Sequence, residues 1–495
     1  MDLTQLFKKT IMRKTTYFII FLLLAGCTKF DNDLYDKSAI QNPDPANVYI
    51  ELRDLIDDVG WWFWAQEVTS DEVVFPVRGT DWNDGGKWRV LHQHEWSNDV
   101  DAVNSMWSHL YDGVRESNRL LDNVLPLAGD PDIDISIAKF RTLRAFFFYL
   151  AMDNYGDIPL VTSFKDAEEF PSKATRQEVY DFVAAELEAS VPLLPSSAND
   201  FAVSQGMGYT LLAKLYLNSE VYTGTAQYEK AEAMCDSVIN LGQYSLDNSV
   251  TAPFAANNIS NQENIFTIIF DENDAQGFRL HMRTLHYLSD ATFGMAVGPW
   301  NGFAVVEDHY NTYDDNDLRK QEWFLVGQQK DKNGGNLFDQ TAGANLVLTP
   351  EIPSLVMGSG NTPTEIRMSG ARVSKYEIEE GALENLNNDF PLFRYADVLL
   401  MKAECAVRLR GAGAGDAFIF PIRDRANAGP TSGFGLDKIL EERGRELFCE
   451  GHRRQDLIRF GRFNDSWWEK PASGQERTTF PIPQWAIEAN PKLGL

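Results

Sequence analysis

The segment between residues 71 and 96 combines indole rings with polar side chains, a mixture that suits the binding of a sugar. A sugar ring has flat apolar C–H faces fringed by hydroxyl groups, so tryptophans can stack on the faces while polar side chains hydrogen-bond the hydroxyls. Gly79, Gly85 and Gly86 let the backbone approach a ligand closely, although glycines also simply form turns. The candidate ligand residues of this segment are Asp71, Arg78, Asp81, Trp82, Trp88 and Trp96.

Burial in the core is the alternative for these tryptophans, because large aromatic side chains are buried on average. Ligand contact and burial both remain open for Trp82 and Trp88, which lie in the polar, glycine-rich part of the segment. Burial is favoured for Trp96. We also expect core positions for four other tryptophans, Trp61, Trp62, Trp64 and Trp107.

Catalytic and metal-binding signatures are weak in this sequence. It contains no G-x-S-x-G, H-E-x-x-H, Walker or Rossmann motif. A glycosidase needs only two suitably placed carboxylates. The chain has 72 acidic residues, so the sequence leaves a glycosidase as an alternative. His92 and His94 could face one side of a strand as metal ligands, but no third ligand follows at a recognisable spacing. Residues 314–317 indicate a solvated acidic turn rather than a calcium loop. We expect no catalytic residue, metal or cofactor.

The elements that would position the candidate residues are predicted to be helices. Apolar residues within 143–150 follow the i, i+3, i+4, i+7 spacing that places them on one helix face. That helix should end near Gly156 and Pro159, which favour a C-terminal cap and prevent continuation. A capping box from Thr175 to Glu178 predicts the start of another helix.

Two helix pairs are predicted further along the chain. Residues 211–216 and 228–239 carry apolar faces on either side of a short polar turn, a unit of about 34 residues that resembles a tetratricopeptide repeat. Residues 395–408 and 416–426 repeat the arrangement. By contrast, residues 245–389 have few helical patterns and one β-like run at 265–270. Long irregular segments of this kind are usually functional.

The N-terminus predicts export and lipid anchoring. Basic residues precede a short apolar run from Tyr17 to Leu24, which is too short for a permanent membrane span. Ala25 and Gly26 precede Cys27, as in a bacterial lipobox, so we expect removal of signal peptide 1–26 and lipid attachment at Cys27. An ordinary signal peptide with a coincidental cysteine is the alternative.

Composition excludes several classes of protein. The chain has 495 residues, 44% of them hydrophobic and 24% charged, as in globular proteins. Its formal net charge of −27 argues against nucleic acid as a partner, because phosphates need a basic surface. After Cys27, only Cys235, Cys405 and Cys449 remain, so we expect buried free thiols rather than a disulfide framework.

Several ordered segments resemble the SusD/RagB family of nutrient-binding outer-membrane lipoproteins. Together with the lipobox they span essentially the whole mature chain. The segments are 140–146 (FRTLRAF), 155–160 (YGDIPL), 393–404 (FRYADVLLMKAE), 441–447 (EERGREL), 450–459 (EGHRRQDLIR), 480–484 (FPIPQ) and 490–491 (NP).

The resemblance implies a mainly α fold: a tetratricopeptide-like helical body of about four helix pairs, packed against loop-rich segments that face the ligand. It divides the chain into an N-terminal part, 27–245, and a C-terminal part, 246–495, within one globular body. It implies a SusC-like TonB-dependent transporter as partner and a ligand site shared by the early loop and a middle loop. Trp300 and Asn301, in the segment 298–303, are the candidates there. A structural turn is the alternative for Trp300.

Arginines and acidic residues alternate between 441 and 459 at helical neighbour spacings. This pattern favours structural ion pairing, with recognition of an anionic ligand as the alternative. The function expected for the whole chain is capture of an oligosaccharide at the cell surface and its delivery to the transporter. A sugar-free scaffold for the transporter and, less favoured, a glycoside hydrolase are the rival hypotheses. The sequence does not identify the glycan or exclude a peptide.

Overall fold

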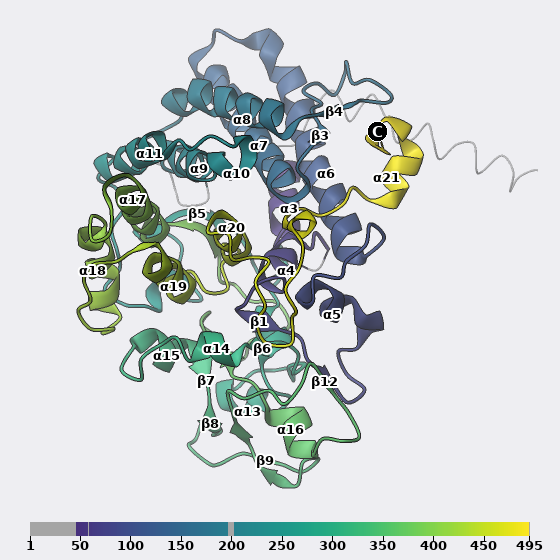
Figure 1. Ribbon diagram of the computed structural model, residues 1–495, viewed down its shortest axis with the longest axis vertical. Coiled ribbons are helices and arrows are strands. Elements are labelled where there is room, and N and C mark those ends of the chain that lie inside the picture. Colours follow the sequence, from purple (N-terminus) through teal and green to yellow (C-terminus); the bar gives the residue numbers. More distant parts are fainter. Residues whose placement is uncertain (1–45, 58, 197–201, 495) are drawn as a thin grey trace, which may run out of the picture.

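The protein folds into a helical body joined to a loop-rich part, as a computed structural model that describes residues 46–57, 59–196 and 202–494 shows (Figure 1). The signal peptide 1–26 and Cys27 lie outside the described residues. The helices of the first part of the chain are α3 (Ala46–Asp54), α4 (Trp62–Glu67), α5 (Lys87–His92), α6 (Asp101–Val124), α7 (Pro131–Tyr155), α8 (Arg176–Ser190), α9 (Gln205–Leu217), α10 (Ser219–Thr223) and α11 (Tyr228–Asn240).

The helical body continues in the C-terminal part of the chain. Helix α6 packs on α7 and α7 on α8, while α9 packs on α11 and α11 on α17. The mainly helical, tetratricopeptide-like fold class is thus confirmed. The C-terminal helices are α17 (Tyr395–Arg410), α18 (Asp416–Arg425), α19 (Leu436–Glu446), α20 (Arg453–Arg459) and α21 (Gln484–Ala489).

Local sequence signals set the helix ends where they were predicted. Thr175 and Glu178 form a reciprocal capping box at the start of α8. Helix α7 ends at Tyr155, and Gly156 follows it with a φ of 76°, a conformation that favours glycine. At its other end, the Asp130 side chain accepts a hydrogen bond from the Asp132 amide.

The middle of the chain forms the loop-rich part, drawn at the bottom of Figure 1. Short helices alternate with short paired strands, as the sequence between 245 and 389 predicts. The helices are α12 (Leu280–Thr284), α13 (Ser289–Phe293), α14 (Glu307–Tyr310), α15 (Leu318–Trp323) and α16 (Pro363–Met368). The antiparallel pairs are β7 (Phe324–Leu325) with β13 (Arg372–Val373), β8 (Gly327–Gln328) with β11 (Val347–Leu348), and β9 (Phe338–Asp339) with β10 (Ala344–Asn345).

Three strand pairs join segments that are far apart in the sequence, and a fourth is local. The early segment is tied to the loop-rich part by β1 (Val73–Val74), antiparallel to β6 (Ala304–Val305), and by β2 (Val77–Arg78), parallel to β12 (Val356–Met357). The predicted run at 265–270 becomes β5 (Asn264–Ile268), which pairs with β14 (Phe390–Arg394). The local pair is β3 (Ile158–Pro159) with β4 (Lys173–Ala174).

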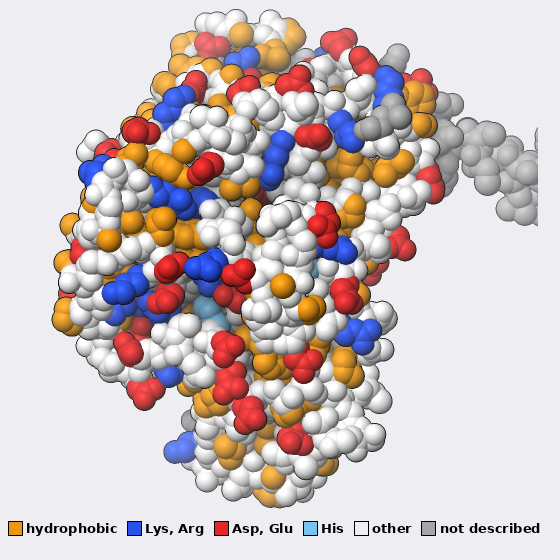
Figure 2. Space-filling model, viewed as in Figure 1, with side chains coloured by type: hydrophobic (Ala, Val, Ile, Leu, Met, Phe, Trp, Pro, Cys, Tyr) orange, Lys and Arg blue, Asp and Glu red, His pale blue; other side chains and the backbone are white. Residues whose placement is uncertain are grey.

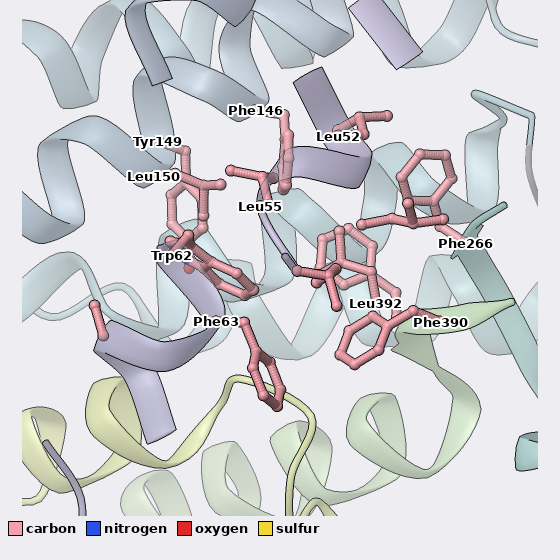
Figure 3. Packing of buried hydrophobic residues seen from close by; sticks show 14 of the residues in the cluster. Leu52, Leu55, Trp62, Phe63, Phe146, Tyr149, Leu150, Phe266, Phe390 and Leu392 are labelled. Carbon is pink, nitrogen blue, oxygen red and sulfur yellow. The ribbon is translucent and has the colours of Figure 1, made fainter. Parts of the chain in front are cut away.

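One large hydrophobic core connects these elements, with members from Val48 to Leu493. In Figure 3, Phe63 of α4 lies near Phe390 of β14, and their ring centroids are 5.7 Å apart in an edge-on contact. The four tryptophans expected in the core are buried, as are Cys235, Cys405 and Cys449 with free thiols. The predicted division between residues 245 and 246 stays a prediction.

Buried ion pairs fill the contact between the C-terminal helices and the loop-rich part. Arg394 bonds Glu263, Glu446 and Glu450, and none of these side chains is exposed. Arg319 and Arg443 are surrounded by carboxylates in the same way. The prediction of structural ion pairing is confirmed. On the face drawn in Figure 2, basic and acidic side chains are likewise interspersed over α18, α19 and α20.

Candidate functional site

The loop between β2 and α5 is wound tightly through left-handed backbone conformations. Gly79, Gly85 and Gly86 have positive φ angles, and so do the non-glycine residues Trp82 (63°) and Asp84 (40°). Residues other than glycine rarely adopt such backbone angles, and where they do, surrounding contacts hold the backbone in place. Here β2 anchors one end of the loop on β12. The loop therefore presents Trp82 in a fixed position.

Trp82 contacts the middle loop, residues 298–303, which was expected to share the ligand site with the early loop. Its indole Nε1 donates a hydrogen bond to the carbonyl oxygen of Trp300 at 2.9 Å. A Cβ added to Gly302 would lie 2.5 Å from the Trp82 ring, so only glycine permits this contact. Both indoles are half-buried at the edge of the core. The structure thus brings together the two tryptophans that the sequence placed in separate segments.

Polar side chains surround the two indoles. The Tyr287 hydroxyl donates a hydrogen bond to the exposed carboxylate of Asp81, and the Arg367 guanidinium lies 4.6 Å from the centre of the Tyr287 ring. Burial, followed by the bond to Asp81, raises the pKa of Tyr287 to about 12, so its hydroxyl keeps its proton at neutral pH. We call Asp81, Trp82, Tyr287, Trp300 and Arg367 the loop surface.

Two predicted tryptophans lie below this surface instead of on it. Trp88 is 1% exposed and stacks on Phe75 with a centroid distance of 3.9 Å. Trp96 is 2% exposed and packs against Phe480, 4.7 Å away. Neither ring has a face open to solvent, so both candidates occupy the core position that the sequence left open for Trp88 and favoured for Trp96. Trp88 instead holds the loop, because its Nε1 donates to Asp84.

Arg78 and Asn301 are also buried, directly behind the loop surface. The Arg78 guanidinium donates to the carbonyl oxygens of Gly302, Ile366 and Ser369 at 3.0–3.1 Å. Asn301 accepts from Arg372 and adopts a φ of 55°. These side chains position the middle loop.

Asp71 forms a bidentate ion pair with Arg453 of α20, at 2.6 and 2.8 Å. Burial would raise the pKa of this carboxyl, but the Arg453 charge and its hydrogen bonds outweigh burial and hold the pKa below its ordinary value. Asp71 therefore belongs to the buried ion pairs and not to the loop surface.

The two histidines weighed as metal ligands bond backbone carbonyls. His92 Nε2 lies 2.8 Å from the Trp468 oxygen, and His94 Nε2 lies 2.8 Å from the Thr69 oxygen. Burial lowers the pKa of His92 to about 4. Within the described ranges, no three His, Cys, Asp or Glu side chains are grouped as metal ligands would be.

Tyr287 and Arg367 are the members of the loop surface that the sequence did not reveal. Tyr287 is 206 residues from its partner Asp81, and Arg367 belongs to α16, a short capped helix. No local motif marks either residue. The pairing of β2 with β12 and of β1 with β6 helps to bring these distant segments to one place.

Comparison with known proteins agrees with this architecture. A family model described as "SusD family" matches residues 262–494, and one described as "Starch-binding associating with outer membrane" matches residues 41–217. The starch-binding protein SusD of Bacteroides thetaiotaomicron is 24% identical over 86% of this chain and 83% of its own length.

Solved structures show the same fold. Surface glycan-binding protein A from Bacteroides thetaiotaomicron in complex with laminarihexaose superposes with a TM-score of 0.71 at 21% identity, covering 92% of this chain and 97% of that one. Surface glycan-binding protein A from Bacteroides uniformis gives 0.72 at 18% identity, covering 90% and 97%.

The two family models follow one another along most of the chain, and the chain belongs to the SusD family. The predicted association with the outer membrane is confirmed by the family description. Among the helices of the described residues, none is both long and apolar enough to span a membrane. Lipid attachment at Cys27 stays a prediction.

Proposed function

We propose that this protein binds an oligosaccharide on the loop surface and delivers it to a SusC-like TonB-dependent transporter, while a lipid on Cys27 tethers it to the outer membrane. The observation that carries the proposal is the pair of half-buried indoles, Trp82 and Trp300, joined by a hydrogen bond and surrounded by polar groups. The similarity to glycan-binding relatives supports it.

The chemistry of the loop surface suits a sugar. Stacking on an indole removes apolar surface from water and orients the sugar ring, while Asp81 and Arg367 offer an acceptor and donors for hydroxyl groups. The tight loop is already ordered around Trp82 before a ligand arrives. Preorganisation of this kind improves affinity, because less conformational entropy is lost on binding.

The proposal is tested by titrating the protein with laminarihexaose and maltohexaose in a calorimeter. We expect Trp82→Ala and Trp300→Ala each to weaken binding at least about tenfold, equivalent to about 1.4 kcal/mol, because each removes a stacking face. Trp485→Ala is the matched control, since this indole is 47% exposed on α21, outside the loop surface.

Other outcomes favour the rival functions. The protein would be a scaffold if it bound the transporter but bound neither these sugars nor any member of a wider glycan panel. Release of new reducing ends over time would indicate a hydrolase.

A further inference from the structure

Two fully buried guanidinium groups lie behind the loop surface and share one hydrogen-bond acceptor. Arg78 Nη2 and Arg372 Nη1 both donate to the carbonyl oxygen of Ser369, at 3.0 and 2.8 Å. Arg78 also donates to Gly302, whose Cα faces the Trp82 ring, and Arg372 donates to the side chain of Asn301, next to Trp300. Two positively charged groups thus lie side by side in the interior. Each one bonds a residue that contacts Trp82 or adjoins Trp300.

Neither of these arginines is paired with a carboxylate. In the part of the chain that the structure describes, no Asp or Glu oxygen lies within 4.0 Å of either guanidinium, and their acceptors are backbone carbonyls and the Asn301 amide oxygen. Burial lowers the pKa of Arg78 to about 9, and burial together with the Arg78 charge lowers the pKa of Arg372 well below its ordinary value. Both groups are still cationic at neutral pH because arginine loses its proton so reluctantly.

Charges of both signs lie beside the loop surface, and the acceptors of Arg78 and Arg372 include none of the carboxylates. Arg367 pairs with Asp339, and its side chain is 20% exposed. His286 also faces Asp339, but burial lowers its pKa to about 3, so it is neutral. Other carboxylates nearby are already bonded: Asp81 accepts from Tyr287, Asp84 accepts from the Trp88 indole, and Glu365 caps the start of α16.

We propose that the loop surface selects saccharides that carry carboxylate or sulfate groups. This inference rests on the proposed function and narrows its substrate class. The low-dielectric interior carries the field of Arg78 and Arg372 to the adjacent surface, so they make the potential there more positive without touching the ligand. Arg367, at the rim, is the contact residue, because a guanidinium can donate two parallel hydrogen bonds to an acidic group.

The experiment compares three hexasaccharides: neutral laminarihexaose, a hexamer of galacturonic acid and sulfated laminarihexaose. Affinities are measured at about 20 mM and about 300 mM NaCl, between which the screening length falls severalfold. We expect at least one acidic hexamer to bind about tenfold or more tightly than the neutral one at low salt, and the advantage to shrink at high salt. The two acidic arms distinguish a carboxylate from a sulfate ligand.

Two variants test the charge directly. Arg367→Gln should reduce the ratio of acidic to neutral affinity, and Asp81→Asn should increase it because it removes the exposed negative charge. Arg410→Gln is the matched control: this arginine is partly exposed, pairs with Glu232 and lies at the end of α17. In Arg410→Gln, the ratio of acidic to neutral affinity should equal that of the wild type.

The outcomes separate this inference from the proposed function. Tighter binding of the neutral hexamer, insensitive to salt but lost in Trp82→Ala, would overturn the selectivity and leave the glycan site intact. Binding of an acidic hexamer with a ratio unchanged in Arg367→Gln and Asp81→Asn would also overturn it. Failure of all three sugars to bind would contradict both proposals.

Discussion

Buried arginines are compensated in one region of this protein and left uncompensated in another. Between the C-terminal helices and the loop-rich part, Arg394 bonds three glutamates. Behind the loop surface, Arg78 and Arg372 have carbonyl oxygens as acceptors and no carboxylate among the described residues. An ion network that only supports the fold can satisfy every charge locally. Buried positive charge that no carboxylate neutralises, lying next to a surface, can instead attract a ligand of opposite charge.

The compensated region offers the largest effect. Arg394 pairs with Glu263, Glu446 and Glu450, and these pairs offset the cost of burying the three carboxylates. Arg394→Met removes the shared cation and leaves the carboxylates buried with too few positive charges. We expect a loss of about 3–5 kcal/mol in the free energy of unfolding, measured by chemical denaturation. Arg410→Met, at a partly exposed pair, should lose less than about 1 kcal/mol. Equal losses in the two variants would show that the buried pairs of Arg394 stabilise the fold no more than a partly exposed pair does.

The opposite imbalance occurs at Glu67 and Glu72, where the same network has carboxylates in excess. Burial raises the pKa of Glu67 to about 7, and burial with the Glu67 charge raises that of Glu72. Asp71 and Glu450 add negative charge nearby, against Arg453 and Lys375.

Glu67 therefore binds a proton more tightly in the native state than in the unfolded state between pH about 4.5 and 7. Its own contribution to the free energy of unfolding should fall as pH rises through this window, by about 1.4 kcal/mol per pH unit, or about 3 kcal/mol in total. Buried histidines such as His92, whose pKa is lowered to about 4, contribute in the opposite direction below pH about 6.5. This contribution of Glu67 is measured as the difference in the free energy of unfolding between the wild type and Glu67→Gln, from denaturation curves recorded at several pH values, and the wild type should lose stability relative to the variant as pH rises. A difference that does not change with pH would show that Glu67 is ionised throughout the window.

The loop surface should tolerate charge changes better than crowding. In Gly302→Ala, the new Cβ would lie 2.5 Å from both the Trp82 ring and the Arg283 carbonyl oxygen. We expect a loss of about 1–3 kcal/mol in stability from overpacking, together with weaker glycan binding because the indole must move. Gly298→Ala is the control, since its Cβ would meet its nearest atom at 3.6 Å. A Gly302→Ala variant with wild-type stability and affinity would show that Trp82 is not held by this contact.

The sequence predicted the parts of this structure that depend on local signals. The capping box of α8, the end of α7 and the helix pairs around Gly224 and Gly411 all follow from residues a few positions apart. The ion network was predicted as a pattern of helical neighbours. In the structure, many partners are distant, as with Arg394 and Glu263, which are 131 residues apart.

The loop surface was predicted only in part, because contacts between distant segments decide which aromatic ring is exposed. Trp82 and Trp88 lie in the same polar, glycine-rich stretch, and nothing local separates them. Phe75 covers the Trp88 ring, while the Trp300 carbonyl holds the edge of Trp82 and leaves it half-buried. Tyr287 completes the surface from a segment without any signature motif.

A crystal structure of the protein with a bound hexasaccharide tests the central claim most directly. We predict a sugar ring stacked on Trp82 or Trp300 at van der Waals distance, about 3.5–4 Å between carbon atoms, with Arg367 or Asp81 bonded to a substituent. A sugar bound elsewhere, for instance in the pocket of about 220 Å³ lined by Phe434, Lys438 and Arg445, with the loop surface empty, would contradict it.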